Sequence, residues 1–170
     1  MKKTSAWIAA SMFLAAPAFA APSATDTEFA TKAAEAGIAE ISAGHAAESK
    51  GESAAVKAFG KKMVDDHTKA ADELKNVAAK SGAKLPTTMS TEQKQAAEKL
   101  AKLKGAAFDT AYSEQAVKDH EGAVALFKNE ASNGSDAGLK SFAQQTLPTL
   151  EEHLRMAKAL PSGGAMSKSP

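Results

Sequence analysis

The sequence contains no cysteine in its 170 residues, which excludes a disulfide framework, a thiolate nucleophile and a lipidated cysteine. Aromatic residues are also scarce, with one tryptophan, one tyrosine and seven phenylalanines. No segment alternates apolar and polar residues with the period of two that a half-buried strand requires. Alanine is abundant instead, and this composition is typical of helices that pack closely through small side chains. The sequence therefore predicts an all-α fold that is held together by its core.

Positive and negative charges are nearly balanced in the sequence. The chain has 21 basic and 20 acidic residues, and without Lys2 and Lys3 the remaining 19 basic residues leave a net charge of about −1. A near-neutral surface argues against nucleic acid or anionic lipid as the main partner. The sequence also has no glycine-rich phosphate loop and no basic stripe interleaved with aromatic residues. We therefore expect no nucleic-acid partner.

The N-terminal segment has the three parts of a secretory signal peptide. Two lysines precede an apolar run over residues 6–16, and residues 18–20 read Ala-Phe-Ala, the small-x-small pattern that signal peptidase accepts. A transmembrane helix would need about 20 apolar residues, which neither this run nor any later segment provides. We therefore predict a signal peptide over residues 1–20, cleavage after Ala20 and a periplasmic location.

Turn signals divide the rest of the chain into helices. Gly51, the pair Asn133-Gly134 and the segment from Gly82 to Pro86 each interrupt a helical pattern. The predicted parts are a disordered leader (21–25), one domain (26–160) with long helices over about 26–49, 53–80, 106–132 and 136–160 and a short charged helix over about 90–104, and a disordered tail (161–170). Two short hairpin connections and one longer middle connection are typical of a ferritin-like four-helix bundle in which the helices before and after the middle connection run parallel. An up-down bundle of five helices is the alternative.

One polar side chain interrupts the apolar stripe of each long helix, where the spacing is close to 3.6 residues. These side chains are Glu40, His67, His120 and His153. Burying an imidazole or carboxylate without a partner costs about 1–3 kcal/mol, so the four groups are expected to meet in one layer of the core. Within each hairpin, the two polar residues lie different numbers of residues away from the turn. At about 1.5 Å per residue, this difference offsets them by about 7 Å along the bundle axis, so the layer is expected to be staggered.

Three imidazoles and one carboxylate suit a zinc, copper or iron ion. Side chains placed to hydrogen-bond to these ligands are Asp66, Asp109, Tyr112 and Asp119. Met63, one turn before His67, is a candidate soft ligand for copper. The alternative is a histidine network that only fixes helix packing, with Met63 as an ordinary core residue. For His45, beside Gly44 near a helix end, we expect a surface role.

Signatures of an enzyme are missing. The di-iron motif of ferritin-like proteins is Glu-x-x-His, whereas the residues three before the candidate histidines are Val64, Val117 and Leu150. Ferroxidase chemistry is therefore not expected. The acidic residues directly before His67 and His153 point about 100° away from them on a helix and do not form a catalytic dyad. The sequence favours a binding or structural protein over an enzyme.

An ordered set of motifs runs through the chain: Met63-Val64-x-Asp66-His67, Gly105-Ala106-Ala107-Phe108-Asp109-x-x-Tyr112, His120, and Leu147-Pro148-x-Leu150-x-x-His153-Leu154. From about Glu28 to Leu160 the chain resembles domain-of-unknown-function family 4142. The resemblance implies an exported bacterial protein with a ferritin-like helical bundle, and it adds Glu40 to the pattern of candidate residues. It brings no established activity. Members often carry an outer-membrane label, but outer-membrane association is not supported by this sequence.

Two functions follow as hypotheses. The first is a periplasmic protein that binds a metal ion or small ligand in its polar core, in a role such as envelope stress protection. The second is a structural or interaction protein whose helical faces bind an envelope protein or a second copy of the chain, while the histidines only specify packing. The metal content of the purified protein distinguishes the two.

Overall fold

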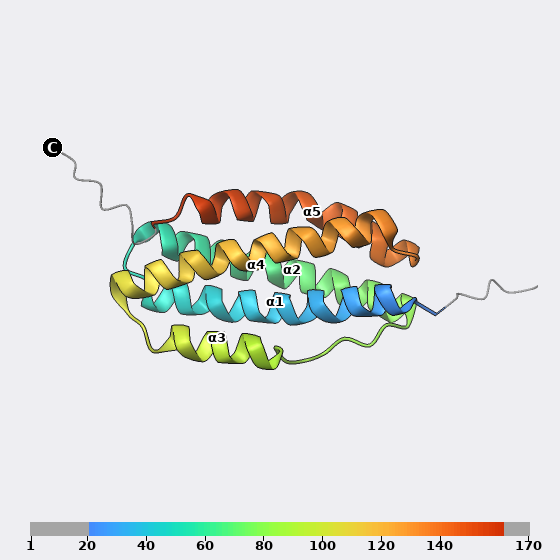
Figure 1. Cartoon of the computed structure of the whole chain (residues 1–170), viewed down its shortest axis with the longest axis horizontal. Coiled ribbons are helices and arrows are strands. Elements are labelled where there is room, and N and C mark those ends of the chain that lie inside the picture. Colours follow the sequence, from blue (N-terminus) through green and yellow to red (C-terminus); the bar gives the residue numbers. More distant parts are fainter. Residues whose placement is uncertain (1–20, 162–170) are drawn as a thin grey trace, which may run out of the picture.

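The computed structural model describes residues 21–161, and within them it contains five helices and no strand (Figure 1). The helices are α1 (Ala24–Lys50), α2 (Ala54–Ser81), α3 (Thr91–Ala101), α4 (Gly105–Asn133) and α5 (Ala137–Lys158). The predicted all-α class is confirmed. The predicted signal peptide and all but the first residue of the predicted tail lie outside the described residues.

The four long helices form a bundle of two hairpins, α1 with α2 and α4 with α5. Helix α2 packs against α5, and α1 packs against α4. Figure 1 shows that α2 and α4 run in the same direction, because the segment after α2 returns along the bundle before α4 begins. Helix α3 lies in this return segment and packs on the outside of α1. The middle connection is thus a crossover, and α3 is not a fifth member of the bundle.

The helix ends differ in detail from the prediction. Ser23 caps α1, because its hydroxyl accepts from Asp26 N (3.1 Å) and its own N–H donates to Asp26 Oδ2 (2.8 Å). This reciprocal pair starts the helix at Ala24, so the disordered leader predicted over 21–25 was too long. Helix α3 ends at Ala101 and not near residue 104. Pro148 lies inside α5, which is a single helix across it.

Helices α1 and α2 touch through their backbones at Gly44 and Gly60. A Cβ atom placed on Gly60 would lie 2.6 Å from Ala47 Cβ and 2.8 Å from Gly44 O, and one on Gly44 would lie 2.7 Å from Gly60 O. No side chain fits at either position without a shift of the helices. Gly60 is on the same face of α2 as His67. The contact therefore sets the separation of α1 and α2 close to the polar layer.

We predict that Gly60→Ala lowers the thermal unfolding temperature. Alanine gains up to about 1 kcal/mol in helix propensity, but forcing an atom into a filled contact costs about 1–3 kcal/mol. Gly122→Ala in α4 is the matched control, because a Cβ atom there meets nothing within 4 Å. The control is expected to raise the unfolding temperature. Equal stabilisation of both variants would show that the helices are not in close contact at Gly60.

Two buried aspartates tie each hairpin to the turn of the other, and we call them the aspartate clamps. Asp109 at the start of α4 accepts from the turn between α1 and α2, and Asp26 at the start of α1 accepts from the turn between α4 and α5. The four hydrogen bonds are Glu52 N to Asp109 Oδ1 (2.9 Å), Ser53 N to Asp109 Oδ2 (2.7 Å), Ser135 N to Asp26 Oδ1 (2.8 Å) and Asp136 N to Asp26 Oδ2 (3.3 Å). Burial opposes ionisation of Asp26, but its hydrogen bonds outweigh burial and lower its pKa to about 2. The clamps fix the register of one hairpin against the other.

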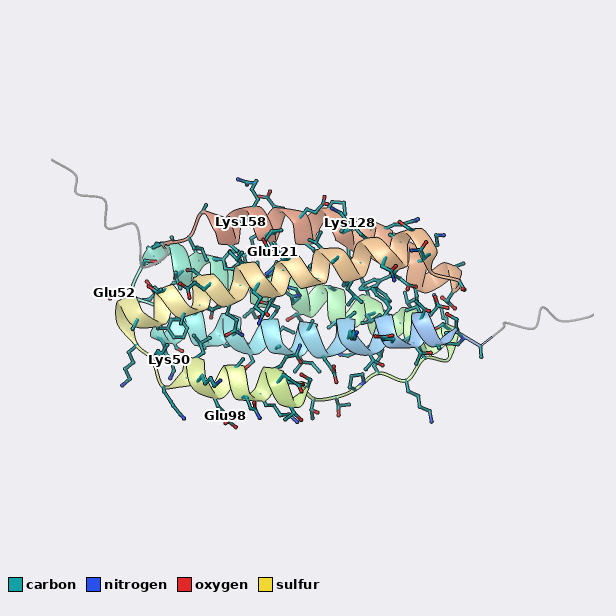
Figure 2. All side chains as sticks on the ribbon, viewed as in Figure 1. Lys50, Glu52, Glu98, Glu121, Lys128 and Lys158 are labelled. Atoms are coloured by element: carbon teal, nitrogen blue, oxygen red, sulfur yellow. The ribbon has the colours of Figure 1, made fainter. Side chains whose placement is uncertain are left out.

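Surface contacts add to this arrangement without defining it. Lys158 of α5 and Glu121 of α4 form an exposed ion pair at 2.9 Å (Figure 2). Lys50 at the end of α1 donates to the carbonyl of Ala101, which ties down the end of α3. Exposed pairs of this kind contribute about 0–1 kcal/mol each. Among residues 21–161, no helix is both long and apolar enough to cross a membrane.

Glu130 is fully buried beside the Asp26 clamp, and neither of its carboxyl oxygens accepts a hydrogen bond from a donor. Its side chain lies against the turn after α4, because a Cβ atom on Gly134 would be 2.4 Å from Glu130 Oε1. Burial, then the charge of Asp26 and the hydrogen bond that protonated Glu130 donates to the Asp26 side chain, raise the pKa of Glu130 to about 7. The folded protein therefore holds a proton on Glu130 that the unfolded chain releases near pH 4.5.

We predict that Glu130→Gln stabilises the protein at pH 8 but not at pH 4. Because the folded-state pKa is raised, wild-type stability falls as the pH rises from about 4.5 to 7, and glutamine removes that loss. Urea unfolding midpoints at the two pH values measure the difference. The same substitution at exposed Glu98 is the control (Figure 2). A Glu130→Gln effect independent of pH would mean that Glu130 ionises normally in the folded state.

Candidate metal centre

The polar layer, which consists of Glu40, His67, His120 and His153, divides the core into two apolar clusters. One cluster contains Phe29, Leu74, Phe127, Phe142 and Leu150, and the other contains Val56, Phe59, Met63, Phe108 and Tyr112. On every long helix the polar residue lies between a member of one cluster and a member of the other. The four side chains are at least 91% buried, with exposed fractions of 6%, 9%, 1% and 1% in chain order. The layer is therefore enclosed on both sides by packed apolar side chains.

The three imidazoles of the polar layer contact one another. Ring centroids are 5.8 Å apart for His67 and His120, 5.5 Å for His67 and His153, and 5.4 Å for His120 and His153. One ring nitrogen from each histidine lies within 4.8 Å of one from each of the others. Glu40 Oε1 is 3.8 Å from His120 Nδ1. Three histidines from three helices thus meet in one place, and Glu40 lies beside the Nδ1 side of His120.

The observed helix ends explain how the stagger is bridged. Glu40 lies 10 residues before the end of α1 and His67 lies 13 residues after the start of α2, a difference of 3 residues. Between α4 and α5 the corresponding counts for His120 and His153 are 13 and 16. The offset in each hairpin is therefore about 4.5 Å and not about 7 Å, because each turn lies one residue later in the chain than predicted, which lengthens the helix before it and shortens the helix after it. Side chains of this length span that distance.

Two of the histidines are oriented by hydrogen bonds on the nitrogen that faces away from the cluster. His120 Nδ1 donates to the carbonyl of Ala116 at 2.8 Å. His153 Nε2 lies 2.9 Å from Asp66 Oδ2, which also accepts from Lys62 Nζ at 2.8 Å. Partial burial opposes ionisation of Asp66, but the bonds from Lys62 and His153 lower its pKa. Asp66 is therefore an anion, and the proton of His153 lies on Nε2.

One buried nitrogen of each ring is left without a hydrogen-bond partner. His67 Nε2, His120 Nε2 and His153 Nδ1 are buried and make no hydrogen bond. Burial lowers the pKa of His67 to about 3 and that of His120 to about 4, and it also lowers the pKa of His153. The three imidazoles are thus neutral at pH 7. Neutral imidazoles with free lone pairs are the form that binds metal ions.

Glu40 is a carboxyl in an unusual state. Burial, and then the charge of Asp119, raise its pKa to about 8, so it carries a proton in the folded protein at pH 7. Tyr112 Oη is also buried without a partner, and burial together with Glu40 raises the pKa of Tyr112. Its ring packs against Phe59 and stacks on Phe108, at centroid distances of 6.1 and 5.8 Å. The layer in this form holds no net charge.

Not every candidate from the sequence reaches the histidines. Asp109 uses both carboxylate oxygens in its clamp, so it holds the turn before α2 and does not orient a histidine. Met63 is fully buried in the apolar cluster with Phe59. His45 is exposed and lies 4.0 Å from Glu48, away from the polar layer. Lys62 is the contributor that the sequence reasoning missed, and its spacing of four residues before Asp66 was the available signal.

A surface pocket of about 470 Å³ connects the polar layer with solvent. It is formed by α1, α2, the start of α3 and α4, and Glu40, His67 and His120 are in its wall. Acidic residues also line it, namely Glu35, Glu92 and Asp119. Lys32 also lines the pocket, but it is paired with Glu28. The crossover that carries α3 thus provides one side of a route to the histidines, and most of the charged side chains along this route are acidic and attract cations.

The fold and the site define a class of protein, an all-α bundle with a cluster of three histidines buried at its centre. A family model described as "Domain of unknown function (DUF4142)" matches residues 11–160. The chain belongs to this family, which confirms the resemblance of its motifs. No curated protein matches the chain.

The fold is also similar to that in the "Crystal structure of DUF305 fragment from Deinococcus radiodurans". The TM-score is 0.71, with 11% sequence identity over 82% of this chain and 97% of that chain. At this identity the similarity shows the fold alone. The helical bundle is therefore common to two chains with 11% sequence identity.

The buried histidines predict a pH dependence of stability. Unfolded histidine has a pKa of about 6.5, whereas His67 and His120 in the folded protein resist protonation until about pH 3 and 4. Below pH 6.5 the unfolded chain therefore binds more protons, and stability falls by on the order of 1 kcal/mol per pH unit per histidine. His67→Gln is expected to flatten this fall between pH 6.5 and 4.

Thermal unfolding at half-unit pH steps measures the slope. The slopes of variant and wild type are compared, because the raised pKa values of Glu40 and Glu130 act in the opposite direction in both proteins. His45→Gln is the matched control, because His45 is exposed and its loss is expected to leave the slope unchanged. If His67→Gln also leaves the slope unchanged, His67 is not held in its neutral form.

Proposed function

We propose that this protein binds one transition-metal ion, zinc, copper or iron, through His67, His120 and His153. The observation that supports it is the set of three unpartnered, buried nitrogens contributed by three different helices. An unsatisfied buried polar group costs about 1–3 kcal/mol, and a histidine layer that served packing alone would pair these nitrogens with donors. A metal ion satisfies all three at once.

The chemistry of the donor set fits such an ion. Three imidazoles leave a further coordination position open for an exogenous ligand. Glu40 lies on the other side of His120, where its Oε1 is 3.8 Å from Nδ1, the nitrogen that donates to Ala116. Metal–nitrogen bonds of about 2.0–2.1 Å in tetrahedral geometry place the ligating nitrogens about 3.4 Å apart, so the imidazoles must approach one another by up to about 1.4 Å from the observed limit of 4.8 Å. The bonds to Ala116 and Asp66 hold two of the rings in the ligating tautomer.

The cellular setting of this proposal is the periplasm, to which the predicted signal peptide would direct the chain. There a protein with a metal site in its core and an acidic route to that site would take up or store metal ions, in keeping with a role in envelope stress protection. The histidines are not arranged with Glu-x-x-His motifs, so the proposed activity is binding and not di-iron oxidation.

Titration of the metal-free protein with zinc, copper or iron tests the proposal. We predict one ion per chain, with binding lost in His120→Ala and His67→Ala and retained in His45→Ala, the matched exposed histidine. Asp66→Asn is expected to weaken binding by about 10–100-fold, because it removes the partner that orients His153. Absence of binding by a folded wild type, or equal binding by all four variants, would contradict the proposal.

A further inference from the structure

A second pocket, separate from the route described above, lies between α1 and α2 under the segment that follows α2. We call it the apolar pocket, and its volume is about 350 Å³. Its lining is Ala33, Ala34, Gly37, Ile38, His67, Ala70, Ala71, Leu74, Lys75, Leu85, Pro86, Thr87, Phe127 and Phe142. Ligand sites in proteins begin at about 300 Å³. The pocket is therefore large enough for a small molecule.

Small residues on both helices create the space. Where larger side chains would interdigitate, α1 presents Ala33 and Gly37, and α2 presents Ala70 and Ala71. A Cβ atom on Gly37 would meet nothing within 4 Å. Gly37 is thus not needed for a close helix contact, in contrast to Gly44 and Gly60. The space beside it is open.

Two phenylalanines form an aromatic wall of the pocket. Phe127 of α4 and Phe142 of α5 are 6% and 5% exposed, and their ring centroids are 5.8 Å apart at an interplanar angle of 52°. Aromatic rings favour tilted and edge-to-face neighbours at such distances. A third ring placed in the pocket would find two rings of this kind to pack against.

The cover of the pocket is held mainly by side chains. Leu85, Pro86 and Thr87 lie over the gap. Leu85 packs on the apolar cluster around Phe127. Within the described residues, no backbone hydrogen bond joins residues 84–89 to α1 or α2. A segment of this kind can move aside at a low cost in hydrogen bonds and return over a bound molecule.

The charges around the pocket favour a neutral ligand. His67 is the buried polar side chain in its wall. Its Nε2 has no hydrogen-bond partner. Lys75 is exposed and is paired with Asp72 at 3.1 Å. Among the described lining residues, therefore, no unpaired charge is available to balance an ionised ligand, whose burial would be costly.

We propose that the apolar pocket binds a small uncharged aromatic molecule of one or two rings. Apolar cavities of about 150 Å³ bind benzene, so a pocket of about 350 Å³ has room for two fused rings. The rings pack between the alanine-lined faces of α1 and α2 and against Phe127 and Phe142. This binding does not depend on a metal ion, so the proposal can be tested independently of the proposed metal site.

The test uses 2-naphthol as a fluorescent probe on the mature chain kept metal-free with a chelator. Wild type is expected to bind it, with a change in probe fluorescence and a rise in unfolding temperature. Gly37→Leu places a side chain in the gap and is expected to weaken binding at least tenfold. Gly37→Ala is the matched control, because it strengthens the helix and leaves most of the pocket open. It is expected to bind the probe nearly as wild type does.

Naphthalene-2-sulfonate, which has the same rings and a fixed negative charge, is the comparison ligand. It is expected to bind at least tenfold more weakly than 2-naphthol. Absence of 2-naphthol binding by folded wild type would overturn the proposal, and so would equal binding by Gly37→Leu, confirmed as folded by its circular dichroism. Equal binding of the sulfonate would show that the site does not select neutral ligands. None of these results depends on metal binding.

Discussion

The two aspartate clamps are the constraint on which the centre of this protein depends. A helix turns by about 100° and rises by about 1.5 Å per residue, so a slip of one residue between the hairpins would move a histidine out of the layer. Asp109 and Asp26 prevent that slip, because each accepts two backbone N–H groups from the turn of the opposite hairpin. One clamp stands at each end of the bundle, and the polar layer lies between them.

The polar layer carries no net charge in the form that the structure describes. Burial removes the charge from three histidines by lowering their pKa values and from Glu40 by raising its pKa. What remains is a set of polar atoms that the protein itself does not satisfy. Such an arrangement is unfavourable as packing, and the unfavourable energy is what an ion with the right geometry would recover.

His67 connects the two parts of the molecule where ligands are proposed. It belongs to the histidine cluster, it is in the wall of the acidic route from solvent, and it is in the wall of the apolar pocket. The crossover from the end of α2 through α3 borders both the apolar pocket and the acidic route. Residues 85–87 cover the apolar pocket, and the start of α3 lies beside the route. The crossover is therefore more than a connection between α2 and α4.

The sequence by itself determined the helices, because turn residues such as Gly51, Gly82 and Gly134 and the 3.6-residue stripes are local features. It also singled out Glu40, His67, His120 and His153, because a polar residue on an apolar stripe can be recognised from the order of the residues alone. It did not reveal that Asp109 serves a clamp, since the N–H groups that Asp109 binds lie 56 and 57 residues away in the chain.

Only the tertiary structure decided which ring nitrogens are free, because this depends on the partners Ala116 and Asp66 that each ring meets after packing. The apolar pocket likewise exists only where α1, α2 and the crossover come together. Alanine and glycine in a helix look the same in sequence whether they permit a close contact, as at Gly60, or leave a gap, as at Gly37. The difference lies in what the neighbouring helix brings to that position, and no local pattern contains it.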